Sequence, residues 1–138
     1  MAAGTTLAVF QGRVWLGRGS SGRELEWTGT GGFDDFSPSN ASGALNINDA
    51  DLVHQITALR TFNNYLFIMG DQSVKQIGNI SLNASGTVTL FTILTLSSDV
   101  GTIYRNSCGS FNRIFMFANP TGIYAVLGSS VQKCWSAL

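Results

Sequence analysis

The fold of this chain is decided by the stretch Phe-Asn-Asn-Tyr-Leu-Phe-Ile at residues 62–68, because the sequence carries three versions of it. The others are Phe-Gln-Gly-Arg-Val-Trp-Leu at residues 10–16 and Phe-Asn-Arg-Ile-Phe-Met-Phe at residues 111–117. In each version a polar turn follows the Phe and leads into an apolar run. A break and a second β-type run then follow. We expect Phe10, Phe62 and Phe111 to occupy equivalent places at the head of equivalent hairpins.

The spacing of the three stretches predicts a repeated β-structure. Their Phe residues stand at positions 10, 62 and 111, which are 52 and 49 residues apart. A period of about 50 residues with short strands and no long helix is typical of four-stranded propeller blades and similar β-repeats. The predicted fold is therefore all-β, one domain over residues 1–138 with antiparallel, blade-like units at about 7–48, 51–98 and 101–138. Propellers have roughly four to eight blades, so we expect an incomplete array or one closed by partner chains at its open β-edges.

Alternating and β-branched runs predict the strands within these units. The first unit has them at 7–10, 13–17 and 24–28, and an irregular stretch follows at 29–48. The second has them at the end of 51–60 and at 65–69, 73–77 and 88–96, and the third at 103–108, 114–117, 123–127 and 131–135. Residues 87–96 are β-branched and uncharged, so they would be adhesive if exposed. We therefore expect the isolated chain to associate or aggregate.

The irregular stretch at 29–48 is the candidate contact surface. Loops of this length in compact proteins are usually functional. Phe33 and Phe36 bracket the carboxylates of Asp34 and Asp35, and Pro38 follows. Aromatic anchors beside polar groups are typical of protein interfaces. We expect these five residues to form a protein contact, and the alternative is that both rings pack on their own sheet.

Composition favours a folded protein that works among partners. Hydrophobic residues make up 44% of the chain and charged residues 12%, and eight Lys and Arg balance eight Asp and Glu. A net charge of zero provides no electrostatic reason to bind nucleic acid or an anionic membrane. The sequence shows neither a basic, apolar leader nor a run near the ~18 apolar residues of a membrane helix. We expect a soluble chain that associates, because low charge protects poorly against association.

No residue pattern supports catalysis, so we expect no enzyme, no cofactor and no metal. His54 is the single histidine and no Gly-x-Ser-x-Gly elbow accompanies it. The Gly-rich run 17–22 lacks the Lys-Ser/Thr ending of a phosphate loop and is interpreted as a hairpin loop. Residues 46–51 cluster oxygen ligands but lack the central Gly and distal Glu of a calcium loop, so a turn or strand cap is preferred over calcium. Asp34 and Asp35 are adjacent, which points their carboxylates apart.

Three further features have both a structural and a functional interpretation. The run Ser21 to Trp27 has the Ser and Trp of a sialidase-type repeat but not its Asp or Gly, which disfavours a glycosidase. Trp15, Trp27 and Tyr124 could stack on sugars, but in alternating strands such rings usually pack in the core. The two cysteines, at positions 108 and 134, lack metal or redox spacing. We expect them to be free thiols.

Several of these stretches, taken in order, resemble the β-propeller part of tail nozzle (tail tubular) proteins of short-tailed bacteriophages. They are residues 10–16, Trp27, 34–38, 65–68, 73–77, Gly101-Thr102 and 122–124. The resemblance spans about residues 7–128 and supplies no catalytic residues. Nozzle subunits are several times longer and have a platform region not seen here, so the chain would be a fragment, a split-gene product or a smaller virion protein with the same repeat.

The resemblance implies a structural, non-enzymatic component of the virion tail. Nozzle proteins assemble as a homo-oligomeric ring that continues the DNA conduit and contacts neighbouring tail or fibre subunits. By this resemblance the partners would be other virion proteins, without specific nucleic-acid or membrane binding. The alternative function is a receptor- or glycan-binding β-module.

Overall fold

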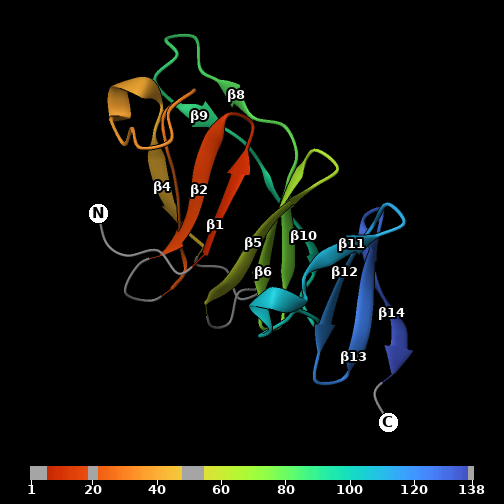
Figure 1. Cartoon of the computed structure of the whole chain (residues 1–138). Coiled ribbons are helices and arrows are strands. Elements are labelled where there is room, and N and C mark those ends of the chain that lie inside the picture. The colour runs from red at the N-terminus through yellow and green to blue at the C-terminus, as the bar shows by residue number, and fades with distance from the viewer. Residues whose placement is uncertain (1–5, 19–21, 48–54, 137–138) are drawn as a thin grey trace.

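The computed structural model describes residues 6–18, 22–47 and 55–136, and these are all-β, without an α-helix (Figure 1). Sheet 1 has β1 (Thr6–Phe10), β2 (Arg13–Arg18), β3 (Glu24–Trp27) and β4 (Gly43–Asn46). Sheet 2 has β5 (Ile56–Phe62), β6 (Tyr65–Gly70), β7 (Val74–Ile77) and β10 (Ile93–Ser97). Sheet 3 has β11 (Gly109–Phe111), β12 (Ile114–Asn119), β13 (Gly122–Leu127) and β14 (Ser130–Ser136). A small ribbon has β8 (Ser81–Leu82) and β9 (Thr89–Leu90), and two 3₁₀ turns are η1 (Pro38–Asn40) and η2 (Arg105–Ser107).

Each of the three large sheets is an open antiparallel meander. Within each sheet, strands that follow one another in the sequence are neighbours. In sheet 2, the β8–β9 ribbon is inserted in the sequence between β7 and β10. Sheet 2 lies between sheets 1 and 3, with β1 beside β5 (Figure 1). The predicted all-β, antiparallel class is therefore confirmed.

The hairpin that opens each sheet is built in the same way, which confirms the expected equivalence of the three Phe residues. Each Phe ends its strand and pairs with the residue three positions later, at Phe10–Arg13, Phe62–Tyr65 and Phe111–Ile114. Both residues of every connecting turn have positive φ, in the pairs Gln11 and Gly12 (52° and 70°), Asn63 and Asn64 (51° and 61°), and Asn112 and Arg113 (51° and 65°). Positive φ at both central residues marks the type I′ turn, whose twist suits a two-residue hairpin.

Two apolar cores lie between the sheets. Because side chains alternate across a strand, β6 sends Leu66 and Ile68 toward sheet 1 and Phe67 and Met69 toward sheet 3. The first core joins sheets 1 and 2 and contains Ala8, Phe10, Trp15, Leu25, Trp27, Ile47, Ile56, Leu59, Leu66, Ile68 and Ile77. The second joins sheets 2 and 3 and contains Ala58, Phe67, Met69, Val74, Phe115, Phe117 and Tyr124.

Three strand predictions are wrong. The stretch at 29–48 is not irregular throughout, since it contains β4, which pairs with β3 along its whole length. Residues 88–96 are not one strand, because the chain leaves β9 at Leu90 and enters β10, in another sheet, at Ile93. The strand expected at 103–108 is replaced by η2, and the first strand of sheet 3 is β11 at the Gly109-Ser110 pair that was expected to be a break. In the first two cases long-range strand pairing overrides the local preference of the sequence. In the third, Arg105 Nε donates to Thr57 O at 3.0 Å and Ser107 Oγ donates to Ala118 O at 3.1 Å, which holds the turn against sheets 2 and 3.

Candidate protein-contact surfaces

The connection from β3 to β4, residues 28–42, is an ordered loop laid across the β1–β2 turn. The amide of Gly31 donates to the carbonyl of Gly12 at 3.1 Å, which fixes the loop to that turn. Within the loop, Gly29 N donates to Asp35 O at 2.7 Å and Thr30 N donates to Asn40 O at 3.1 Å. The backbone groups are thus paired internally, as an ordered connection requires.

The five predicted contact residues lie together on this loop but differ in exposure. Phe33 is 78% exposed, and Asp34 and Pro38 are exposed as well. Phe36 and Asp35 are half-buried. The loop therefore presents an apolar ring and a carboxylate to solvent, so Phe33 does not pack on its own sheet.

Asp35 organises the loop. Its carboxylate accepts from the backbone N of Ser37 at 2.9 Å and from Asn40 Nδ2 at 2.6 Å. The bond from the Ser37 backbone, and then that from Asn40, lower the pKa of Asp35, because hydrogen bonds to a carboxylate favour its charged form. Asp35 therefore stabilises the conformation of the loop, whereas the Asp34 side chain is exposed.

A buried polar clamp ties this loop to the β8–β9 ribbon. The guanidinium of Arg13 donates to Thr30 Oγ1 at 3.0 Å and to Thr89 Oγ1 on the β8–β9 ribbon. Thr89 in turn donates to the carbonyl of Ala41 at 2.7 Å. Desolvation lowers the pKa of Arg13. The clamp holds the candidate contact loop in a defined position relative to the ribbon.

An apolar groove of about 860 Å³ lies between the ribbon and the outer strands of sheets 1 and 2. The aromatic pair Trp27 and Phe91 contributes to its lining, with ring centroids 5.0 Å apart and an edge-to-face geometry. Its other lining residues include Ala44, Leu45, Tyr65, Gln76, Gly78, Asn79, Ser81, Val88, Thr89, Leu90, Thr92 and Leu94. Sequence reasoning missed this groove because β4 and the ribbon, which form much of it, were not recognised.

The aromatic rings that could have stacked on sugars belong to the cores. Trp15, Trp27 and Tyr124 are all buried. Trp15 Nε1 donates to Phe10 O at 3.0 Å, and Trp27 Nε1 donates to Ala41 O at 3.2 Å. The core-packing interpretation of these rings is confirmed, and it satisfies the polar atoms of both indoles.

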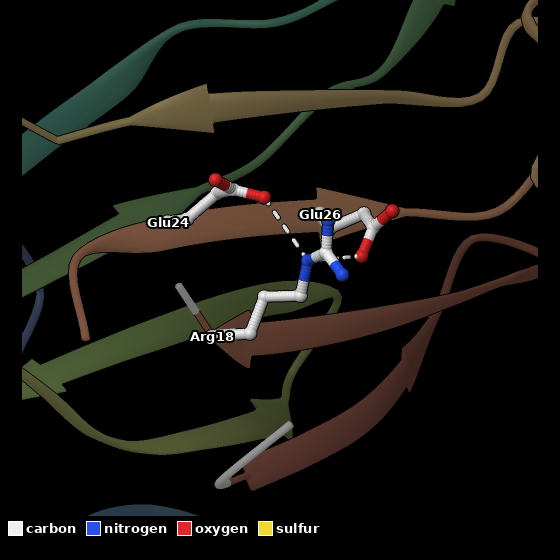
Figure 2. Close-up of polar contacts among 3 residues, drawn as sticks. All are labelled: Arg18, Glu24 and Glu26. Atoms are coloured by element: carbon white, nitrogen blue, oxygen red, sulfur yellow. Dashed lines mark hydrogen bonds and ion pairs between the residues drawn. The ribbon is translucent and has the colours of Figure 1, made fainter. Parts of the chain in front are cut away.

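The Gly-rich run at 17–22 begins beside an ion-pair cluster (Figure 2). Arg18 Nε lies 3.0 Å from Glu24 Oε1 and 2.5 Å from Glu26 Oε2. The cluster forms because Arg18 pairs with Glu24 across β2 and β3, and Glu26 stands two residues further along β3 on the same face. Residues 19–21 lie outside the described residues. The positive charge of Arg18 is therefore paired with two carboxylates of its own sheet.

The remaining candidate sites for chemistry can be placed only in part. His54 and residues 48–51 of the calcium candidate lie outside the described residues. Within residues 6–18, 22–47 and 55–136, no three His, Cys, Asp or Glu side chains form a group that could hold a metal. Cys108 is half-buried, exposed Cys134 is free like it, and burial raises the pKa of the Cys108 thiol. None of the helices in this part of the chain has the length and apolarity to cross a membrane.

Comparison with known proteins identifies no relative that would assign a function to these surfaces. A scan against protein-family models matches none of them to this chain, and a search of curated proteins finds no match.

Proposed function

We propose that this chain is a non-enzymatic structural component of a bacteriophage tail, a nozzle- or hub-like β-propeller segment that assembles with other virion proteins. One observation carries the proposal. Three four-stranded meanders follow one another with the same strand order and the same opening hairpin, and they pack face to face. Propellers are built by radial repetition of four-stranded sheets, and these three sheets would be part of such an array.

Exposed apolar side chains support a role in assembly. Phe33 projects from the β3–β4 loop, and Leu90 and Leu94 are exposed beside the apolar groove. Contiguous exposed apolar surface usually marks an interaction site. The chain has no net charge to favour electrostatic contacts, so these surfaces suit protein partners that cover them.

The assignment to a phage tail rests on the resemblance of the ordered motifs to tail nozzle proteins. The loop at 34–38 is part of that resemblance, and it occupies an exposed position next to Phe33. A loop presented in this way is suited to contact a neighbouring tail or fibre subunit. The proposed partners are other tail proteins and further copies of the chain in a ring.

Labelling of phage particles tests the proposal. Antibodies raised against the purified chain should decorate the tail of particles assembled with it, as seen by electron microscopy. In particles made with Phe33→Ala, incorporation of the chain should fall several-fold while its thermal unfolding is unchanged, because Phe33 is exposed. Leu82→Ala, another exposed apolar residue, is the control and should incorporate normally. Particles that lack the chain, or that carry it only in the head, would contradict the tail assignment.

The alternative, a receptor- or glycan-binding β-module, has one feature in its favour. Tyr65 is 38% exposed and lines the groove together with the amides of Gln76 and Asn79. An exposed ring beside amide groups can stack on and hydrogen-bond to a sugar. Glycan-array binding by the purified chain that is abolished by Tyr65→Ala would favour this alternative over the structural role.

A further inference from the structure

Each large sheet has two faces with different roles. We call Phe10, Phe62 and Phe111 the motif Phe residues. The face of each sheet that carries its motif Phe is the front, and the opposite face is the back. Phe10 and Trp15 on the front of sheet 1 pack with Leu59 and Leu66 on the back of sheet 2. On the front of sheet 2, Phe67 stacks on Phe115 of the back of sheet 3, with ring centroids 4.6 Å apart. Inside the chain, fronts therefore always pack on backs.

The exposure of the motif Phe side chain shows whether another sheet covers the front of its sheet. Phe10 is 3% exposed beneath sheet 2, and Phe62 is partly buried against sheet 3 with its ring 5.9 Å from that of Phe115. Phe111 stands at the same register with the same turn but is 74% exposed. The difference follows from what lies in front of each sheet, since no described element covers Phe111. The front of sheet 3 is thus uncovered, whereas the equivalent fronts of sheets 1 and 2 are buried.

The exposure of the residue three positions before each motif Phe shows whether the back of its sheet is covered. Leu59 pairs with Ile68 and is fully buried against sheet 1, and Cys108 packs against the core between sheets 2 and 3. Leu7, in the same register opposite Leu16, is 57% exposed. The back of sheet 1 is therefore uncovered in the same sense as the front of sheet 3.

We propose that a second copy of this chain covers both faces, with the front of sheet 3 of each copy packed on the back of sheet 1 of the other. Two copies with three large sheets each would bring six sheets into one ring, within the roughly four to eight of propellers. The proposal rests on the repeated-sheet part of the proposed function and not on its place in a virion.

The fit of the two faces is argued from their equivalents within the chain. Phe115, which receives Phe62 and Phe67, stands at the same place in sheet 3 as Val14 in sheet 1, four residues after the motif Phe. Phe111 and Met116 of one copy would therefore contact Val14 of the other. Each contact would join unlike surfaces, and such heterologous contacts form a closed assembly when the rotation between copies closes.

Charge does not oppose this contact. The front of sheet 3 carries apolar side chains at Phe111, Ile114, Met116, Ala118, Ile123 and Leu127. On the back of sheet 1, Leu7 is exposed and Val14 is partly exposed, whereas Leu16 is already buried. The charged Arg18 on this face pairs with Glu24 and Glu26 of the same face (Figure 2). The second copy would bury apolar surface on apolar surface, the usual driving force for association.

Analytical ultracentrifugation of the purified chain tests the proposal. The wild type should sediment as a dimer at micromolar concentration. Phe111→Asp and Leu7→Asp should each raise the dimer dissociation constant by about 30-fold or more, as hot-spot substitutions do. Leu82→Asp is the control. Leu82 is 41% exposed on the β8–β9 ribbon and belongs to neither face, so this variant should dimerise normally.

Mixing the two defective variants distinguishes this arrangement from a symmetric one. Phe111→Asp retains an intact back and Leu7→Asp retains an intact front, so a mixture should recover heterodimers through one undamaged contact. Far-ultraviolet circular dichroism and thermal unfolding of each variant show that it is folded, which is expected because both positions are exposed.

Several results would overturn the proposal. These are a monomeric wild type, a dimer that survives both substitutions, a mixture without recovery, or a filament in place of the closed dimer. A monomer would mean that another polypeptide or another segment covers the faces, and it would leave the tail assignment to the labelling experiment. Unlabelled particles with a confirmed dimer would contradict the tail assignment alone.

Discussion

Position 101 requires a glycine because the backbone of residues 70–73 lies where a side chain would be. A Cβ at this position would lie 2.1 Å from Gly70 O and 2.6 Å from Ser73 N. The next residue, Thr102, donates its amide to Gly70 O at 2.8 Å and its hydroxyl to Ala118 O at 2.6 Å, so it joins sheets 2 and 3. The neighbours of Gly101 are backbone atoms in bonded segments and cannot move aside cheaply.

We therefore predict that Gly101→Ala lowers the free energy of unfolding by about 1–3 kcal/mol, the range for overpacking a well-packed site. Gly109→Ala is the control, because a Cβ there would meet no atom within 4 Å. Urea unfolding of both variants at one protein concentration measures the difference. Equal stability of the two variants would show that the backbone around Gly101 yields more readily than its hydrogen bonds indicate.

At the scale of elements, the opening hairpins share a turn geometry but not the residues that suit it. The second turn residue is Gly12, Asn64 or Arg113, always at positive φ. Glycine adopts this conformation without steric cost, asparagine tolerates it, and other residues with a side chain are disfavoured there. The hairpin of sheet 3 therefore contains a less suitable residue than that of sheet 1.

Adding a side chain in one turn and removing one in the other should change stability with opposite sign. We predict that Gly12→Ala destabilises the chain by about 1 kcal/mol, since a Cβ there meets no atom and the cost is conformational. Arg113→Gly should stabilise it by about 0.5 kcal/mol, because relief of the left-handed strain exceeds the entropy cost of glycine. Thermal unfolding measures both, and shifts of the same sign would contradict the shared turn geometry.

In the whole molecule, a polar clamp fixes the β8–β9 ribbon to sheet 1 and to the β3–β4 loop, beside the apolar core between sheets 1 and 2. Thr89 accepts from Arg13 of β2 and donates to Ala41 O of the loop. All of these contacts span long sequence separations. They position the loop that carries Phe33 relative to the groove beside the ribbon.

Removal of the clamp should be costly because it leaves buried polar atoms without partners. We predict that Thr89→Val lowers the free energy of unfolding by about 1–3 kcal/mol. Thr92→Val, at an exposed position nearby, should change it by less than about 0.5 kcal/mol. Hydrogen exchange should also show faster exchange of the Gly31 amide in Thr89→Val, since the loop loses its tie to the ribbon. Unchanged exchange would show that the loop is held by the β1–β2 turn alone.

The sequence by itself determined the all-β class, the three opening hairpins and the place of the loop that carries Phe33. These features follow from local chemistry, because side-chain alternation and two-residue turns act over only a few residues. Strand β4 could not be predicted, since Gly43-Ala44-Leu45-Asn46 is extended through its pairing with β3. Likewise, η2 replaces the strand that the composition of residues 103–108 favours.

Only the tertiary structure decided which apolar residues are core and which are surface. Phe10 and Phe111 share residue type, register and turn, yet one is buried and the other exposed. The difference depends on whether another sheet lies in front. The same holds for Leu59 and Leu7 on the opposite face. Burial is a property of two surfaces that meet, and the second surface comes from residues distant in sequence.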